Sequence, residues 1–377
     1  MTPTARKTSS TTRKLIFVTG GSGFIGLHIL TQLLDKGYNV RAYAYPSNVS
    51  LPHPTLLFRA ARGRKIELLK RALSANYSRD NFEVVEVRDV CSGDFSRILK
   101  GVDGIIHAAA PLPGRVSAEA ALRTAIEGSL HVLREAVRAK VPRAVVTSSV
   151  LTYDFPKGPY DADVWNTITK EEAIASGHPF LIYAAQKKYS DLAVVEFSHI
   201  HPEIDVTLVG PPFNYGPFAP GFEHLLPEPD LNALSTNSTI YSFLRPDTAA
   251  FPIAPGAIDV RDTARAHVLA LESPLSSKIG RKRIAIVCPR ECSYRVAIET
   301  IARERPELKE RLADARLAPE WSSNTLPLDW KRIEEVIGIK PDSFVPWEKT
   351  VLDSVDSLLR IENFWKGKGF KLQGYIR

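Results

Sequence analysis

Three residues with the chemistry of proton transfer occur at informative spacings. Ser149 ends the apolar run AVVTSS, and Tyr183 follows 34 residues later in YAAQK, with Lys187 four positions further on. Because an α-helix has ~3.6 residues per turn, Tyr183 and Lys187 share one helix face. A phenol with an unperturbed pKa of ~10 is a weak acid near neutrality, but an adjacent ammonium favours its ionised form. The pattern predicts that Tyr183 donates a proton to a carbonyl oxygen, tuned by Lys187 and oriented by Ser149.

A glycine-rich turn near the N-terminus predicts a dinucleotide site. Residues 14–19, KLIFVT, form a short apolar run that is followed by GGSGFIG and the helical pattern LHILTQLLDKG. Gly20, Gly23 and Gly26 suit a turn where a pyrophosphate and a helix must approach the backbone closely. The amide groups and the positive dipole end of that helix would hold the phosphates. A strand, this turn and an amphipathic helix, in that order, indicate a cofactor site.

Strand patterns recur along the first 210 residues, with helical patterns between them. They are FEVVEV at 82–87, GIIHAAA at 104–110, AVVTSS at 144–149 and DVTLVG at 205–210. Apolar strands that alternate with helices predict an α/β fold of the Rossmann type, with a doubly wound parallel sheet. Ligands of such sheets lie beyond the carboxyl ends of the strands, so we expect the cofactor at that edge.

The composition changes near residue 211, where a proline-rich stretch begins. Prolines favour irregular loops over the strand ends instead of another wound layer. We therefore expect a dinucleotide-binding domain at 14–210 and a smaller substrate lobe at 211–377. A helix at 259–271 is expected to return to the first domain, so that the lobe is discontinuous. Further helical patterns lie near 293–315, 329–337 and 347–362.

The second strand departs from the expected pattern. The residue at its end should determine whether the site binds NAD or NADP. An acid there accepts a hydrogen bond from a ribose 2′-hydroxyl, whereas an arginine pairs with a 2′-phosphate. After GYNV, the continuation RAYAYP offers neither at the strand end, whereas FRAARGRK at 58–65 supplies Arg62. Residues 41–57 are therefore interpreted as an insertion, either an uncommonly long surface loop or a translated intron. In both cases Arg62 favours NADP(H), with NAD(H) as the alternative.

Composition argues against several other classes of protein. The 377 residues include 49 basic and 42 acidic side chains that are interleaved, which indicates a solvated surface and no nucleic-acid site. Three cysteines are too few for a disulfide framework or a four-ligand zinc site, so we expect no metal and a cytoplasmic protein. No apolar run reaches the ~20 residues of a membrane span. Residues 1–13 are interpreted as a disordered tail, with a mitochondrial transit peptide as the alternative.

Together the motifs resemble those of one enzyme family. They are VTGGSGFIG, GVDGIIHAAAPLP, AIEGSLHVL, VVTSS, YAAQKK, GPPFNYGP and IDVRDTARAHVLAL. They are similar to the extended short-chain dehydrogenases of the NAD-dependent epimerase/dehydratase family, in the branch of dihydroflavonol reductase and fungal methylglyoxal or aldehyde reductases. The resemblance covers about residues 14–365. It implies NADPH-dependent reduction of a small or medium hydrophobic aldehyde or ketone, by a monomer or homodimer.

The resemblance and the strand ends together give the expected site. The residues expected to line the cofactor, besides Tyr183 and Lys187, are Thr19, Gly20, Gly23, Phe24, Ile25, Gly26, Arg62, Asp89, Val90, Ala108, Ala109, Ala110, Pro211, Pro212 and Phe213. The residues expected to line the substrate are Pro111, Leu112, Pro113, Val150, Leu151, Phe155 and Tyr215. Glu127 departs from the family pattern, because some relatives place there an asparagine that continues a proton relay.

Three other functions share parts of this pattern. A nucleotide-sugar epimerase or dehydratase keeps the same three residues, but dehydratases place an Asp-Glu pair after the serine, where Val150 and Leu151 stand. Epimerases retain NAD and favour an acid after the second strand. Oxidation of a 3β-hydroxysteroid with NAD uses the same chemistry in reverse. A non-catalytic sensor of NADP would be expected to lose Tyr183 or Lys187, and this chain keeps both.

Overall fold

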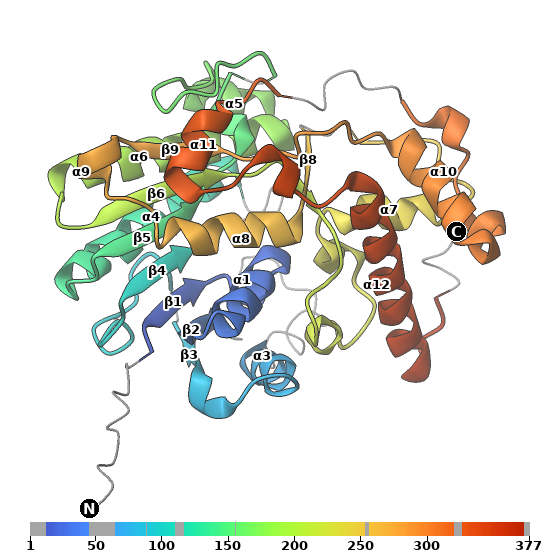
Figure 1. Ribbon diagram of the computed structural model, residues 1–377, viewed down its shortest axis with the longest axis horizontal. Helices are drawn as coiled ribbons and strands as arrows, with labels where there is room; N and C mark the ends of the chain where they lie inside the picture. Colours follow the sequence, from blue (N-terminus) through green and yellow to red (C-terminus); the bar gives the residue numbers. More distant parts are fainter. Residues whose placement is uncertain are drawn as a thin grey trace, which may run out of the picture.

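A large parallel sheet organises the first domain (Figure 1). The computed structural model describes residues 13–44, 65–87, 89–109, 117–154, 156–252, 256–319 and 326–372. Within these ranges, seven parallel strands form the main sheet in the order β3-β2-β1-β4-β5-β6-β9. The order 3-2-1-4-5-6 is that of a Rossmann sheet, so the predicted fold class is confirmed.

The strands of this sheet include one that sequence patterns did not predict. They are β1 (Leu15–Thr19), β2 (Asn39–Ala44), β3 (Phe82–Glu86), β4 (Gly104–His107), β5 (Arg143–Thr147), β6 (Asp205–Gly210) and β9 (Lys282–Ala285). β9 reads KRIA and was missed because two of its four residues are basic, although both are buried. It extends the sheet beyond β6, so the return to the first domain reaches further than the expected helix at 259–271.

The second strand corrects the expected boundary of the insertion. β2 continues to Ala44 and pairs with β3 as far as Glu86. Residues 41–44, which were expected to begin an insertion, therefore belong to the sheet. The remainder of the expected insertion, 45–57, lies outside the described residues, as does the expected N-terminal tail apart from Arg13.

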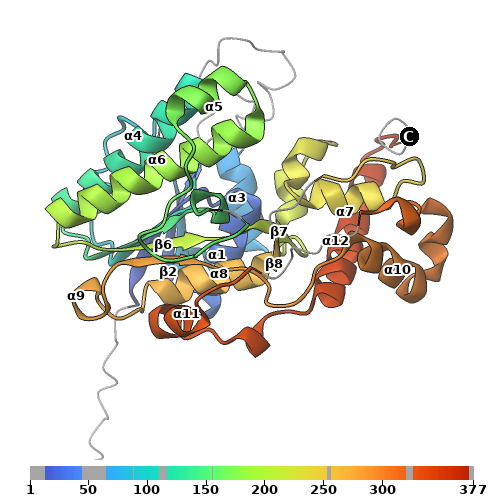
Figure 2. The same cartoon turned by 90° about the horizontal axis from the view of Figure 1, so that it is seen from above.

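Helices cover both faces of the sheet (Figure 2). α4 (Ala118–Arg138) and α6 (Pro179–Ile200) contribute to the apolar cluster on one face. α1 (Phe24–Asp35), α8 (Val260–Ala270) and α11 (Trp330–Ile337) contribute to a second cluster on the other. Three further helices are α3 (Lys65–Ser74), α5 (Lys170–Ser176) and α9 (Ser276–Ile279). None of the helices in the described ranges is long and apolar enough to cross a membrane.

A smaller lobe lies beside the sheet, where Figure 2 shows α7, α10 and α12 together. Its elements are β7 (Phe213–Tyr215), α7 (Asn237–Phe243), β8 (Ala257–Asp259), α10 (Tyr294–Glu304) and α12 (Trp347–Gly367). β7 and β8 form a parallel two-stranded sheet. The helical pattern expected near 293–315 is divided, because α10 ends at Glu304, just before a proline. α11, expected to complete the lobe, packs instead against α8 and β9.

A buried ion pair fastens β9 to the sheet. The Lys282 ammonium donates to the carboxylate of Asp205 at 2.6 Å and to the hydroxyl of Ser273 at 2.7 Å. The two charged side chains are only 1% and 9% exposed. Removing one partner of such a pair leaves an uncompensated buried charge, which costs more than the pair contributes when it is intact.

We therefore predict that Lys282→Ala lowers the free energy of unfolding by about 3 kcal/mol, because Asp205 loses its nearest buried cation and keeps only the Arg143 guanidinium at 3.9 Å. Urea denaturation followed by circular dichroism measures this change. Lys278→Ala, at an exposed position of α9, is the matched control and should leave the unfolding midpoint unchanged. Equal unfolding midpoints for the two variants would contradict the prediction.

Candidate active site

The turn between β1 and α1 has room and hydrogen-bond donors for a phosphate. Gly20 has a φ of +74°, and a Cβ added at Gly26 would lie 2.0 Å from the carbonyl oxygen of Gly20. α1 begins after Gly23, and within this described segment no side chain caps its first amides and no acid occupies its first turn. Uncapped amides at a helix N-terminus attract phosphate groups. These residues fit the pyrophosphate of a dinucleotide.

The end of β4 lies directly against this turn. A Cβ added at Gly20 would lie 2.9 Å from backbone atoms of Ala108 and Ala109, so the structure brings these predicted cofactor residues together. The Thr19 side chain is fully buried, and its hydroxyl lies 2.8 Å from His107 Nδ1 and accepts from the Ala109 amide at 3.1 Å. Thr19 therefore joins the ends of β1 and β4 with its side chain.

The three predicted catalytic residues meet at the carboxyl end of β5. Ser149 follows that strand, and its hydroxyl accepts from the Leu151 amide at 3.2 Å and hydrogen-bonds the Tyr183 phenol. Lys187, one turn after Tyr183 on α6, donates from Nζ to the carbonyl of Thr147 at 2.7 Å. The arrangement places a phenol, a hydroxyl and an ammonium at one strand end.

Burial dominates the electrostatics of this group. It raises the pKa of Tyr183 to about 12, with the Asp191 charge adding to the rise and the hydrogen bond from Ser149 opposing it. Burial also lowers the pKa of Lys187, and the Asp191 charge opposes that shift. A phenol with a raised pKa stays protonated near neutral pH, so Tyr183 is available as a proton donor.

The segment after β6 is tied to the catalytic strand end. The Ser148 amide donates to the carbonyl of Val209 at 2.8 Å, and the Val150 amide donates to that of Pro211 at 3.2 Å. Pro211 and the Pro212–Phe213 pair that follows are thus held beside Ser149, and their contact with a cofactor stays a prediction. Asn214, which sequence patterns did not single out, anchors this segment. It donates to the Pro212 carbonyl at 3.0 Å and accepts from the hydroxyl of Thr263 at 2.5 Å.

Of the predicted substrate residues, Val150 and Leu151 lie beside the catalytic group, whereas Tyr215 lies in the smaller lobe. Val150 and Leu151 are buried in an apolar cluster that the Tyr183 ring also contacts, so they line the catalytic strand end. Tyr215 is fully buried in the core of the smaller lobe, and its hydroxyl lies 2.9 Å from that of Tyr294. This burial assigns Tyr215 to lobe packing, whereas the sequence suggested a place beside the substrate.

The loop after β3 is shaped by Asp89. Its carboxylate accepts from the Ser92 hydroxyl at 2.6 Å and from the Cys91 amide at 2.9 Å, and the Ser92 bond is the main cause of its lowered pKa. The next residue, Val90, is buried, and its contact with a cofactor stays a prediction. Glu127 is 48% exposed and pairs with Arg134 at 3.3 Å, so it takes no part in the catalytic group.

Phe24 and Ile25 open α1 directly after the phosphate turn, and their contact with a cofactor stays a prediction. Six other predicted site residues lie outside the described ranges, and their roles also stay predictions. They are Arg62, Ala110, Pro111, Leu112, Pro113 and Phe155.

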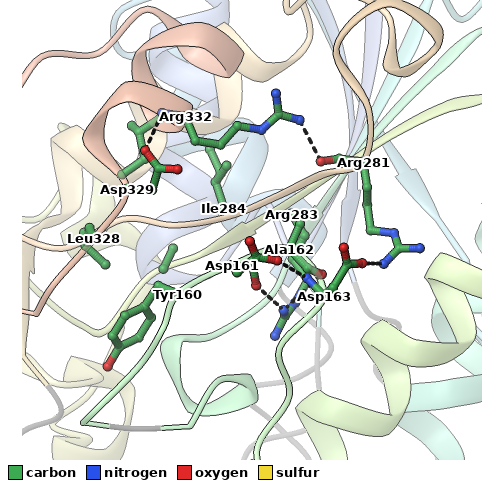
Figure 3. Close-up of a pocket in the computed structure, with 12 residues that line it drawn as sticks. Tyr160, Asp161, Ala162, Asp163, Arg281, Arg283, Ile284, Leu328, Asp329 and Arg332 are labelled. Atoms are coloured by element: carbon green, nitrogen blue, oxygen red, sulfur yellow. Dashed lines mark hydrogen bonds and ion pairs between the residues drawn. The ribbon is translucent and has the colours of Figure 1, made fainter.

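A pocket with a volume of about 210 Å³ lies beside β9, the edge strand of the sheet (Figure 3). Arg283 in its wall donates to the carbonyls of Val164 at 2.7 Å and Thr152 at 3.1 Å. Its guanidinium carbon lies 3.7 Å and 3.6 Å from the ring centroids of Tyr153 and Trp165, so both rings contact the cation. Arg283 therefore fastens the loop after Ser149 to the sheet. The catalytic residues are not among those that line this pocket, all of which are described.

Sequence reasoning missed two buried charged residues near the catalytic group, Arg283 and Asp191. Asp191 carried a usable signal, since it follows Tyr183 and Lys187 at the same four-residue spacing on one helix. Arg283 carried none, because an arginine at the end of the basic run 281–283 predicts an exposed position.

Comparison with known proteins gives matches over most of the chain. The sequence profile of the NAD dependent epimerase/dehydratase family matches residues 16–285. An uncharacterized oxidoreductase of Schizosaccharomyces pombe is 33% identical over 286 residues, which cover 72% of this chain and 77% of that protein. A Candida albicans protein named as an NADPH-dependent methylglyoxal reductase is 28% identical over 373 residues, 93% of this chain and 99% of its own.

A solved structure shows the same fold. Yeast methylglyoxal/isovaleraldehyde reductase, crystallised as a complex with NADPH, superposes with a TM-score of 0.70 and 22% sequence identity. The superposition covers 93% of this chain and 99% of the yeast chain. The smaller lobe is therefore shared as well as the sheet.

We predict that Gly26→Ala weakens NADPH binding by about tenfold or more, because the new Cβ would meet the Gly20 carbonyl and distort the phosphate turn. Fluorescence titration with NADPH measures the dissociation constant. Gly367→Ala is the control, since open space surrounds that glycine. Thermal unfolding of both variants separates lost binding from lost folding, and unchanged affinity in Gly26→Ala would refute the turn as the phosphate site.

Proposed function

Because this chain belongs to the NAD dependent epimerase/dehydratase family, we propose that it is an oxidoreductase that uses NADPH to reduce a small or medium hydrophobic aldehyde or ketone to an alcohol. The observation that carries the proposal is the meeting of Ser149, Tyr183 and Lys187 at the end of β5. The phosphate turn at the end of β1 lies at the same edge of the parallel sheet.

The catalytic residues have separate tasks in this reaction. NADPH, when bound, supplies the hydride that the carbonyl carbon accepts. Ser149 donates a hydrogen bond to the carbonyl oxygen and holds it beside Tyr183. Tyr183 gives its phenolic proton to that oxygen as the alcohol forms. The Lys187 ammonium, fixed by the Thr147 carbonyl, stabilises the phenolate that remains.

The surroundings of Ser149 favour reduction over the sugar-nucleotide chemistry of other family members. Val150 and Leu151 follow the serine and are buried in an apolar cluster. No carboxylate stands there to protonate a leaving hydroxyl, as a dehydratase would need. Two relatives support the same choice, since the Candida protein is named as an NADPH-dependent methylglyoxal reductase and the yeast methylglyoxal/isovaleraldehyde reductase was crystallised with NADPH. The proposal also includes a cytoplasmic location and a monomeric or homodimeric state.

We predict that Tyr183→Phe lowers kcat for NADPH-dependent carbonyl reduction by about 100-fold or more, because the general acid is lost. Absorbance of NADPH during turnover of a panel of hydrophobic aldehydes and ketones measures the rate. Tyr189→Phe, on the same helix, is the matched control and should retain the wild-type rate. NADPH affinity should be nearly equal in both. Full activity in Tyr183→Phe would overturn the proposed function.

Cofactor choice gives a second test. We predict that the protein binds NADPH at least about tenfold more tightly than NADH, and that Arg62→Ala removes the difference, because the arginine pairs with the 2′-phosphate. Calorimetric titration of both cofactors measures the two affinities. A preference for NADH would instead favour the epimerase or hydroxysteroid chemistry. An NADPH preference that survives in Arg62→Ala would assign the phosphate to another residue.

A further inference from the structure

Asp191 extends the catalytic face of α6 by one more turn. Tyr183, Lys187 and Asp191 are spaced four residues apart, so the three side chains lie on one side of the helix. Asp191 is only 1% exposed. Carboxylates are almost never this deeply buried unless other groups compensate their charge.

Ser148 holds the Asp191 carboxylate against the end of β5. The Ser148 hydroxyl donates a hydrogen bond to Asp191 Oδ2. Ser148 is itself 2% exposed and is fixed by the bond from its amide to Val209. The next residue in the chain is Ser149. Asp191 therefore touches the strand end that carries one catalytic residue and shares a helix face with the other two.

Two buried cations face Asp191 without contacting it directly. Lys187 on α6 donates to the Thr147 carbonyl, and Arg283 on β9 donates to carbonyls of the loop after Ser149. Among the described residues, neither cation has a carboxylate within ion-pair distance, yet both interact electrostatically with Asp191. The buried carboxylate thus offsets part of the charge of a catalytic ammonium and of a structural guanidinium.

Arg283 also interacts with the charge of Asp161, but the other ionisable groups near Lys187 do not supply it with a negative charge. His107 of β4 and His267 of α8 lie near Lys187, and burial lowers the pKa of their rings to about 3 and about 4, so both are neutral. Tyr153 faces Asp191 from the loop after β5, and burial raises its pKa, so it stays protonated.

We propose that Asp191 is a positioning residue for carbonyl reduction, whose buried charge keeps Lys187 as an ammonium and Tyr183 as a protonated phenol. The inference deepens the proposed function and rests on it. Asp191 touches neither substrate nor cofactor in this account. It acts through Lys187 and Tyr183, the residues that do.

The direction of the effect follows from the charges. Burial raises the pKa of Asp191 to about 6, while the Ser148 bond and the Arg283 and Lys187 charges lower it, so the carboxylate is ionised at alkaline pH. A nearby negative charge raises the pKa of an ammonium and also that of a phenol. Without the Asp191 charge, Lys187 and Tyr183 both lose their protons at a lower pH. The rate of carbonyl reduction then begins to fall at a lower pH as well.

The test is the pH profile of kcat for NADPH-dependent reduction, measured from about pH 6 to about pH 10. The alkaline limb is the part of this profile where kcat falls as the pH rises. In Asp191→Asn it should move down by about one pH unit, while the affinity for NADPH changes less than about threefold. Asp191→Glu retains the charge and should restore most of the wild-type profile. Asp191→Ser is a second neutral variant, and it replaces Asp191→Asn in the comparison if the asparagine protein does not fold.

Ser148→Ala separates charge from packing. It removes the hydrogen bond but leaves Asp191 ionised at alkaline pH, so the limb should stay in place even though thermal stability falls. An alkaline limb that is unmoved in Asp191→Asn, or moved equally in Ser148→Ala, overturns the inference.

Tyr183→Phe is measured in the same assay, as a control for the proposed function. If that variant remains active, the proposed function fails; if it is inactive and the Asp191 profile is unmoved, only the role of Asp191 fails.

Discussion

The hydrogen bond from Lys187 to the Thr147 carbonyl, 2.7 Å long, joins α6 to the end of β5, and the rest of the site depends on it. It fixes the helix against the strand, which sets the Tyr183 phenol beside the Ser149 hydroxyl. The bond also places the Lys187 ammonium in the protein interior, where an uncompensated charge destabilises the folded state. The buried carboxylate of Asp191 offsets part of that cost, while His107 and His267 nearby are kept neutral mainly by their own burial.

Local sequence was sufficient for most of the sheet. The glycine turn and the apolar runs identify β1 and β3–β6, because each is a short apolar segment between helical patterns. β9 was out of reach, since Lys282 and Arg283 are satisfied by residues far away in the sequence and only the fold brings those partners together. The end of β2 was misplaced because the sequence after Val40 lacks the family pattern, whereas the strand is held by its neighbours β1 and β3.

The site was predictable where spacing along one helix or at one strand end defines it. Tyr183 and Lys187 share a helix face by periodicity alone, and Ser149 ends an apolar strand. Roles that depend on long-range packing were not accessible. The sequence could not show that Tyr215 would bond Tyr294 inside the smaller lobe. Nor could it show that the Thr19 side chain would turn toward His107.

The most direct test of the central claim follows the hydride itself. NADPH carrying deuterium at the transferred position of its nicotinamide is incubated with the protein and a hydrophobic aldehyde or ketone that it consumes, and the product is examined by mass spectrometry and proton NMR. The account predicts an alcohol with one deuterium on the former carbonyl carbon, formed in equal amount to the NADPH oxidised. An alcohol without deuterium, or NADPH loss without alcohol, would contradict direct hydride transfer at the Ser149–Tyr183–Lys187 site.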